Sequence, residues 1–320
     1  MQTALDIARG IVDGKRLQPT DDLEFFLTTP LDELQAGARL IQRKFFGNHI
    51  DLCTIINGKS GRCGEDCKYC AQSARHHTGI EEYEFLPAEK ILSVALANER
   101  AGVNRFSIVT SGRALSGKNF ERAIDTYKFL RGRLKIDLCA SHGILTAEQL
   151  QRLKAAGVKR YHHNLETSRR YFAHICTTHT YDDRIATIKH AQAAGLEVCS
   201  GGIIGMGETW QDRFDMAFEL AALKIGSIPI NILTAIKGTA FENLPRLTPD
   251  EILRTIAVFR YINPTANVRF AAGRTFLPDR GASALLNGAS AAITGNMLTT
   301  PNNNVKADMK LLQELGLTNH

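Results

Sequence analysis

The chain has 320 residues, 44% of them hydrophobic, and a formal charge of +6, so it is long enough to bury the core of one large α/β barrel. Its basic residues are interleaved with Asp and Glu, which favours a solvated enzyme surface over a nucleic-acid-binding one. No apolar run is long enough to span a membrane and the N-terminus does not resemble a signal peptide, so we expect a cytoplasmic protein with neither a nucleic-acid nor a membrane partner.

Residues 1 to about 48 carry apolar side chains at helical spacing and predict two or three amphipathic helices. Thr20-Asp21-Asp22 and Thr29-Pro30 are the expected helix starts. We expect this N-terminal helical extension, residues 1–48, to form a cap on a barrel made of residues 49–320.

From Ile50 onward, short apolar runs alternate with longer helical stretches, a pattern typical of a parallel sheet. Several helical stretches end in Gly, as helix C-termini often do. Eight such units without a Pro-, Gly- or Ser-rich linker predict one (βα)8 TIM-type barrel. An open doubly wound sheet is the alternative, but the chain has no glycine-rich dinucleotide loop to support it. The candidate strands lie near residues 50–57, 104–111, 135–141, 159–166, 197–205, 228–235, 267–273 and 289–295.

The loop after the first predicted strand carries Cys63, Cys67 and Cys70 within eight residues. In a barrel this loop lies at the C-terminal face, where catalytic groups gather. Thiolates bind zinc or iron–sulfur clusters, and a Cys3His zinc site would need His76 or His77 as its fourth ligand. Three cysteines on a four-iron cluster instead leave one iron open to a further ligand, an arrangement that suits catalysis.

The other four of the seven cysteines lie elsewhere in the chain. Cys53, Cys139 and Cys199 fall in the first, third and fifth predicted strands. A buried free cysteine is often a small core residue, but inward-pointing residues of alternate barrel strands can share a layer. These three side chains could therefore converge on one point. Cys176 lies outside any predicted strand, where a packed loop cysteine is the alternative to a ligand.

Polar residues occupy two other predicted strands. His162, Asn164 and Glu166 alternate along the fourth, so the period of two places them on one face. Buried polar groups are costly without partners, and we therefore expect this face to line a polar cavity. Asn231, between apolar neighbours in the sixth strand, also needs hydrogen-bond partners.

Taken together, several motifs resemble the radical S-adenosylmethionine superfamily and, within it, the biotin synthase family over about residues 45 to 305. They are GRCGEDCKYCAQSAR, YHHNLET, CTTHTYDDR, VCSGGIIGMGET, PINIL, KGT, VRFAAGR and ITGNMLTTPNNN. The resemblance implies a [4Fe-4S] cluster on Cys63, Cys67 and Cys70 with S-adenosylmethionine at its open iron. It also implies a 5′-deoxyadenosyl radical that removes hydrogen from dethiobiotin, and sulfur from a second iron–sulfur cluster that completes biotin. An electron donor such as flavodoxin or ferredoxin, and a homodimer, are further implications.

The resemblance also implies roles for individual residues. Arg184 resembles the partner of the methionine carboxylate, and Glu166 the partner of the ribose hydroxyls. Asn164 and Asn231 are similar to the residues that bind the ureido ring of dethiobiotin. The other implied cofactor-binding residues are Tyr69, Gly201, Ile203 and Gly205.

The second cluster of this family usually has two irons, held by three cysteines and an arginine. Cys139, Cys199 and Arg269 match three of these ligands, but the strand that should supply the third cysteine carries Ser107. We expect Cys53 to compensate, so that a four-iron cluster becomes as plausible as a [2Fe-2S] cluster. The candidate ligands are therefore Cys53, Cys139, Cys199, Arg269 and Cys176.

Two other functions compete with this interpretation. Another radical enzyme on the same framework, a maturase or methyltransferase-like relative, needs no sulfur from the protein. Ser107 favours it, whereas Cys139 and Asn231 speak against it. A zinc-stabilised binding module predicts a colourless protein with one zinc ion, instead of a brown, oxygen-sensitive one.

Overall fold

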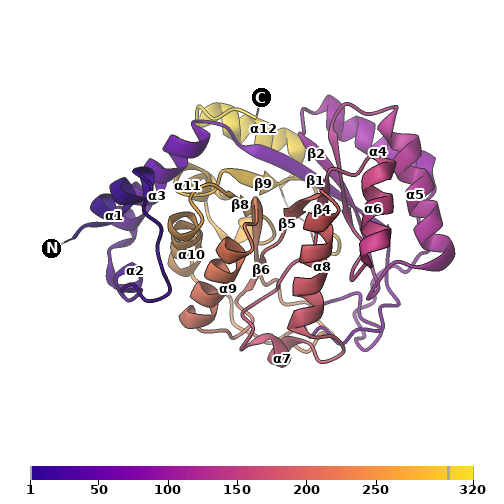
Figure 1. Ribbon diagram of the computed structural model, residues 1–320, viewed down its shortest axis with the longest axis horizontal. Helices are drawn as coiled ribbons and strands as arrows, with labels where there is room; N and C mark the ends of the chain where they lie inside the picture. Colours follow the sequence, from indigo (N-terminus) through magenta and orange to yellow (C-terminus); the bar gives the residue numbers. More distant parts are fainter. Residues whose placement is uncertain (1, 301–302, 320) are drawn as a thin grey trace.

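A closed barrel of parallel strands forms the centre of the computed structural model, which describes residues 2–300 and 303–319 (Figure 1). The strand order is β5-β4-β3-β2-β1-β9-β8-β7-β6, and β5 also pairs with β7 through Cys199 and Ser227, which closes the barrel. The predicted (βα)8 TIM-type fold is therefore confirmed. The strands are β1 (Asp51–Lys59), β2 (Arg105–Thr110), β3 (Asp137–Ser141), β4 (Arg160–His162), β5 (Glu197–Cys199), β6 (Gly202–Ile204), β7 (Ser227–Ile232), β8 (Asn267–Phe270) and β9 (Ala291–Ile293).

Helices surround the barrel, and a repeated threonine cap starts four of them. Thr146, Thr180, Thr209 and Thr248 each accept a hydrogen bond from the backbone three residues later, whose side chain bonds back to the cap. Such a cap contributes about 1 kcal/mol. Within the described residues, none of the helices has the length and apolar character needed to cross a bilayer. They are α4 (Ala88–Arg100), α5 (Gly117–Arg131), α6 (Ala147–Ala156), α7 (Phe172–Ile175), α8 (Tyr181–Ala193), α9 (Trp210–Ala222), α10 (Pro249–Ile262), η1 (Arg274–Phe276), α11 (Ala282–Leu286) and α12 (Val305–Glu314).

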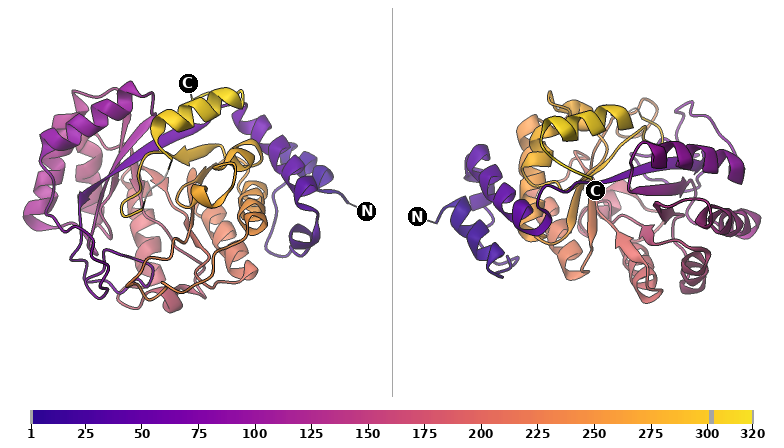
Figure 2. Two further views of the ribbon diagram at one scale, coloured as in Figure 1. Left: turned by 180° about the vertical axis from the view of Figure 1, so that it is seen from behind. Right: turned by 90° about the horizontal axis from the view of Figure 1, so that it is seen from above.

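The N-terminal helices α1 (Ala4–Val12), α2 (Phe25–Thr28) and α3 (Leu31–Phe46) lie on one flank of the barrel, beside α10 (Figure 2). Tyr261 of α10 donates to the Leu34 carbonyl at 3.1 Å. A Cβ at Gly37 would lie 1.8 Å from the Tyr261 hydroxyl oxygen, so glycine permits this close approach. The predicted start of α3 after Thr29-Pro30 is confirmed.

The two faces of the strands differ in composition. Phe106, Leu138 and Ala140 point outward and are buried beneath the helices. The alternating inward positions carry Ser107 and Cys139 instead, which line an interior cavity. Barrel interiors are usually filled by branched aliphatic side chains, so polar and sulfur-containing residues here leave room for a ligand.

Two predicted strands differ from the observed ones. Regular β4 ends at His162, although the N–H groups of His163 and Leu165 still donate to the Cys199 and Gly201 carbonyls at 3.0 and 2.9 Å. The predicted strand is therefore too long, but the prediction that His162, Asn164 and Glu166 share one face that lines a cavity is confirmed. The fifth predicted strand is divided into β5 and β6. In the break, a Cβ at Gly201 would lie 2.0 Å from the Pro229 carbonyl oxygen, so glycine permits this close approach.

Candidate active site

The loop between β1 and α4 carries the three closely spaced cysteines and is held by its own backbone. The Cys63 N–H donates to the Gln72 carbonyl at 3.1 Å, and the Cys63 carbonyl accepts from Ala74 N–H at 2.7 Å. The Cys70 N–H donates to the Cys67 carbonyl at 2.9 Å, and this turn keeps the two residues close together. The loop is therefore ordered without a helix or strand.

The thiols of this loop are shielded from water. Cys63 and Cys67 are buried, and Cys70 is partly buried. A hydrogen bond to Cys176, together with burial, raises the pKa of Cys67, and burial raises the pKa of Cys70 to about 11. Such thiols keep their protons until a metal displaces them. A set of three shielded sulfur ligands fits an iron–sulfur cluster.

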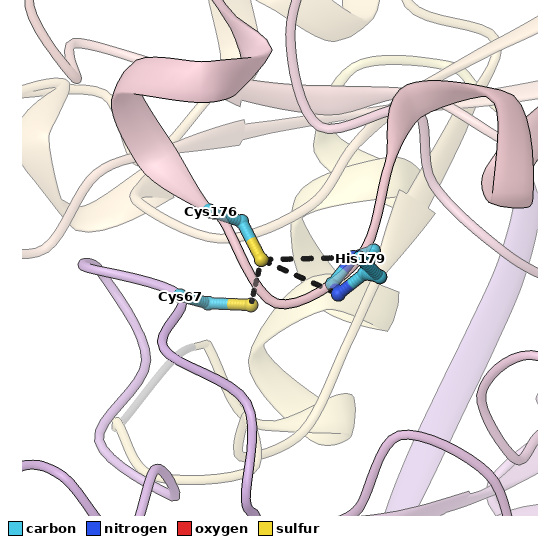
Figure 3. A group of neighbouring side chains, drawn as sticks. All are labelled: Cys67, Cys176 and His179. Carbon is cyan, nitrogen blue, oxygen red and sulfur yellow. Dashed lines mark hydrogen bonds between the residues drawn. The ribbon is translucent and has the colours of Figure 1, made fainter.

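Cys176 directly follows α7 and contacts this loop (Figure 3). Its sulfur atom lies 3.7 Å from the sulfur atom of Cys67. It does not line the cavity that contains the strand cysteines. The prediction that Cys176 is a ligand of a second cluster is therefore wrong, because α7 and the loop after it carry the residue toward the C-terminal face instead of into the barrel.

One cavity of about 280 Å³ occupies the barrel interior. Tyr69 of the cysteine loop lines it, as do Met297 and Leu298 of the segment after β9. The late motif ITGNMLTTPNNN therefore contributes to the cavity, although its Pro301 and Asn302 lie outside the described residues. Enclosure by mainly apolar walls with a few polar groups is typical of small-molecule sites. The cavity also contacts Cys53, Ser107, Cys139, Arg160, His162, Asn164, Glu166, Cys199, Ile203, Asn231 and Arg269.

The three strand cysteines do converge on this cavity, as the alternate-strand argument predicts. A hydrogen bond joins Cys53 and Cys139 and lowers the pKa of Cys53. Burial alone would raise the pKa of Cys199, but a hydrogen bond from His162 and the charge of Arg269 lower it to about 6. The lowered pKa values of Cys53 and Cys199 favour the thiolate, the form that binds metal, whereas the hydrogen bond with Cys53 and burial raise the pKa of Cys139.

Arg269 is fully buried beside these cysteines and is held by four hydrogen bonds. Its Nη1 donates to the carbonyls of Asp51 and Ala292 at 3.0 and 2.9 Å, and its Nη2 donates to Asp51 Oδ2 at 2.8 Å. Its Nε donates to Ser227 Oγ at 3.4 Å. Among the described residues, one Nη2 hydrogen is left for another acceptor.

Asp51, at the start of β1, joins three arginines. Its Oδ2 lies 2.8 Å from Arg269, 3.2 Å from Arg105 and 3.6 Å from Arg160. Burial alone would raise the pKa of Asp51, but Arg269, Arg105 and Arg160 lower it to about 2. Asp137 bonds Arg105 at 2.7 Å and Glu197 bonds Arg160 at 2.7 Å, so three carboxylates balance the three arginines of this network.

Asn164, Glu166 and Arg184 form a second polar group closer to the cysteine loop. Arg184 Nη1 donates to the Asn164 carbonyl at 2.9 Å and lies 3.4 Å from Glu166 Oε1. Asn164 Nδ2 donates to Glu166 Oε2 at 3.2 Å. Arg184 Nε is buried and has no acceptor within the described chain. An incoming carboxylate would satisfy it, which fits a bound amino acid group.

The glycine-containing segment predicted to bind a cofactor follows the same cavity. The Gly201 N–H donates to Asn164 Oδ1 at 3.1 Å, and the Ile203 N–H donates to the Glu166 carbonyl at 2.8 Å. Gly205 donates to Glu208 at 2.9 Å instead, and its φ of 91° makes a sharp turn. Only Ile203 of these three residues lines the cavity directly.

Asn231 spans two strands at the cavity wall. Its Nδ2 donates to the Gly202 carbonyl at 3.2 Å, and its Oδ1 accepts from Ala272 N–H at 3.3 Å. A side-chain amide has two donors and an oxygen with two lone pairs. One donor and one lone pair therefore stay available to a ligand in the cavity.

Several residues of the site escaped the sequence analysis. Asp51, Arg105 and Arg160 form one ion-pair network, of which Arg160 lines the cavity. Their signal was a charged residue at the first position of β1, β2 and β4. Glu65 and His179 hydrogen-bond to each other beside Cys176. CTTHT contains this histidine, but nothing in its spacing indicated the distant cysteine loop.

Comparison with known proteins gives two family matches that together span most of the chain. A model described as "Radical SAM superfamily" matches residues 59–220. A second, described as "Biotin and Thiamin Synthesis associated domain", matches residues 229–318. The first contains the three-cysteine loop and the second contains Asn231 and Arg269.

Curated relatives match over nearly the whole chain. Biotin synthase of Clostridium beijerinckii is 55% identical over 312 residues, which are 98% of this chain and 99% of that protein. Biotin synthase of Clostridium perfringens is 59% identical over 287 residues, 90% of each chain.

Solved structures share the fold at much lower identity. Methylornithine synthase superposes with a TM-score of 0.85 at 17% identity, covering 98% of this chain and 97% of the other. A maturase of the [FeFe]-hydrogenase superposes with a TM-score of 0.82 at 18% identity, covering 98% and 74%. These two likenesses concern the fold alone.

Proposed function

The chain belongs to the biotin synthase family, and from this premise we propose how its own residues convert dethiobiotin into biotin. It is a radical S-adenosylmethionine sulfurtransferase that uses a [4Fe-4S] cluster. One observation supports the assignment of residues best. Tyr69 of the cysteine loop and the strand cysteines Cys53, Cys139 and Cys199 line a single cavity.

Cys63, Cys67 and Cys70 are the proposed ligands of the [4Fe-4S] cluster. Their shared loop and their shielding from water support this assignment. When bound, the cluster and S-adenosylmethionine supply a radical that removes hydrogen from an unactivated carbon. The protein contributes an enclosed cavity, which keeps water away from such a reactive species.

Arg184 is the proposed partner of the S-adenosylmethionine carboxylate. Its unpartnered Nε supports this role, since a guanidinium can offer Nε and one Nη to the two oxygens of one carboxylate. Glu166, fixed by Asn164 and Arg184, offers its carboxylate oxygens to the ribose hydroxyls. The proposed surroundings of the rest of the cofactor are Tyr69, Gly201, Ile203 and Gly205.

Asn164 and Asn231 are the proposed partners of the ureido ring of dethiobiotin. A ureido group offers N–H donors and a carbonyl acceptor, which match the spare donor and lone pair of Asn231. The substrate would then lie in the cavity between the cysteine loop and the strand cysteines.

Cys53, Cys139 and Cys199 are the proposed ligands of a second iron–sulfur cluster, the source of the inserted sulfur. Their convergence on one cavity and the unused Nη2 hydrogen of the buried Arg269 beside them support an anionic group at this end. Ser107 pairs with Cys139 in the sheet and offers a hydroxyl where the family has a thiolate. A two-iron and a four-iron cluster both agree with three cysteines.

Arg269 borders this second cluster in our proposal. Four of its five N–H groups are already committed to Asp51, Ala292 and Ser227. The remaining Nη2 hydrogen can be donated to a cluster sulfur. Flavodoxin or ferredoxin as electron donor, and a homodimer, are proposals that rest on the family alone.

An anaerobic assay with dethiobiotin and S-adenosylmethionine tests this function by measuring biotin and 5′-deoxyadenosine together. The wild-type chain should form both products. A Cys53→Ala, Cys139→Ala and Cys199→Ala triple variant should form deoxyadenosine without biotin, because it keeps the cysteine loop. Deoxyadenosine without biotin from the wild-type chain would instead indicate a different substrate.

A further inference from the structure

Cys67, Cys176 and His179 form a compact group outside the cavity (Figure 3). The Cys67 and Cys176 sulfurs lie 3.7 Å apart, and Cys176 Sγ lies 3.3 Å from His179 Nδ1 and 3.9 Å from Nε2. The three ligand atoms fall within 4.8 Å of one another, and all three residues are buried. Within the described chain, this is the group compact enough for a single metal ion.

These distances match two sulfurs and one nitrogen on a tetrahedral ion. Zinc–sulfur bonds of about 2.3 Å and zinc–nitrogen bonds of about 2.0 Å place ligand sulfurs about 3.8 Å apart and a sulfur and nitrogen about 3.5 Å apart. In a cluster, two cysteine thiolates bind different irons, so the separation between the irons increases the distance between the two sulfurs. The Cys67–Cys176 spacing therefore fits one ion and not two irons of a cluster.

The surrounding carboxylates complete such a site. Glu65 Oε2 is hydrogen-bonded to His179 Nδ1, and Thr178 Oγ1 donates to the same oxygen at 2.7 Å. This leaves Nε2, 3.9 Å from Cys176 Sγ, as the ring nitrogen without a carboxylate partner and free for a metal, as in carboxylate–histidine–metal arrangements. Asp66 Oδ1 lies 3.2 Å from Cys176 Sγ, within reach as a fourth ligand.

The fold holds the two contributing segments together. Lys68 N–H donates to the Ile175 carbonyl at 2.9 Å, and Asp66 N–H donates to Thr178 Oγ1 at 3.2 Å. Thr180 caps α8 directly after His179 and fixes the chain there. The ligands are thus arranged before any ion arrives, although Cys67 and Cys176 lie 109 residues apart in sequence.

We propose that the cluster-free chain binds one Zn²⁺-class divalent ion through Cys67, Cys176 and His179, with Asp66 as the fourth ligand. Binding displaces the thiol protons to solvent and changes no oxidation state. Because Cys67 is also a proposed ligand of the [4Fe-4S] cluster, the single ion and the cluster exclude each other. The exclusion rests on the proposed function, whereas binding of the ion does not.

Titration of the iron-free, reduced full-length chain with Co²⁺ tests the site through thiolate-to-cobalt and ligand-field absorption. The informative pair is Cys67→Ser against a Cys63→Ser and Cys70→Ser double variant. Each removes ligands of the [4Fe-4S] cluster, but only the first removes a ligand of the single-ion site. The double variant should keep the tetrahedral cobalt spectrum, while Cys67→Ser and Cys176→Ser should each weaken cobalt binding at least about tenfold. Circular dichroism of each variant verifies its fold.

Loss of the cobalt spectrum in the double variant, or an unchanged spectrum in Cys176→Ser, would overturn the site. A Cys199→Ser variant is the control for cobalt held by the strand cysteines, and it should keep the tetrahedral spectrum. The exclusion is tested separately by the ratio of iron uptake after and before addition of Zn²⁺. This ratio should lie well below one in the wild-type chain and close to one in Cys176→Ser. Equal ratios in both would refute the exclusion while leaving the activity assay unaffected.

Discussion

The two groups of cysteines are held in different ways. Cys63, Cys67 and Cys70 lie on an irregular loop fixed by its own backbone hydrogen bonds, with the carboxylates of Glu65 and Asp66 nearby. The strand cysteines instead lie on the rigid barrel wall, beside a buried network of arginines around Asp51. An irregular loop can adjust its backbone around a charged cofactor when the cofactor binds. The barrel end presents a fixed surface, in which the buried Arg269 keeps one Nη2 hydrogen for a further acceptor.

The largest expected effect tests the charge network at the barrel end. Asp51→Asn leaves Arg269 buried without its countercharge, and breaking such a pair typically costs about 3–5 kcal/mol. Asp137→Asn is the matched control, because Asp137 bonds Arg105 at 2.7 Å but its side chain is 39% exposed. Its loss should cost less than about 1 kcal/mol. Chemical denaturation measures both values, and equal costs would contradict a special role for Asp51.

Acid should weaken the same network over a defined range. The folded-state pKa of Asp51 is lowered from 3.8 to about 2, so its stabilisation is fully present above pH 4 and is lost as the pH falls toward 2. A shift of this size corresponds to about 2 kcal/mol. The free energy of unfolding of the wild-type chain should fall over this range more steeply than that of Asp51→Asn. Parallel curves for the two proteins would refute the assignment.

Near the cysteine loop, Arg184→Gln should weaken S-adenosylmethionine binding by about 30-fold, since hydrogen bonds between charged groups contribute about 2 kcal/mol. Arg169→Gln is the control. Arg169 pairs with Asp182 at 2.8 Å, but its side chain is 54% exposed, whereas that of Arg184 is buried beside Glu166. Equilibrium dialysis with cluster-loaded protein gives the dissociation constants. Equal affinity in the two variants would remove Arg184 from the cofactor site.

The smallest effect concerns the substrate between the two regions. Asn231→Ala should weaken dethiobiotin binding about threefold to tenfold, the effect of one or two neutral hydrogen bonds. Iron content should not change, because the Asn231 amide hydrogen-bonds to Gly202 and Ala272 and to none of the cysteines in the described part of the chain. Asn243→Ala, at an exposed position, is the control for binding. Unchanged affinity in Asn231→Ala would exclude the amide from the substrate site.

The barrel could be predicted from the sequence because each strand is a short apolar run that lies between two helical stretches. Spacing alone also predicted that Cys53, Cys139 and Cys199 converge, since inward positions of alternate strands meet in one layer. The predicted fourth strand was too long, since regular β4 ends at His162. The period of two still placed His162, Asn164 and Glu166 on one face, because all three line the cavity.

Contacts between distant segments escaped prediction for a different reason. The Asp51 network depends on the barrel closing, and single charged residues at strand starts do not reveal which of them will meet. Cys176 was assigned to the wrong region because its direction depends on α7 and the loop after it. Loop geometry of this kind is set by tertiary contacts such as the Lys68–Ile175 hydrogen bond, not by local pattern.

Iron and sulfide counting after anaerobic reconstitution tests the central claim of two separate sulfur-ligated regions most directly. In a variant carrying Cys63→Ala, Cys67→Ala and Cys70→Ala, the barrel end should keep its own cluster, either about two or about four iron ions per chain. About zero residual iron and sulfide in this correctly folded variant would contradict a second cluster on Cys53, Cys139 and Cys199.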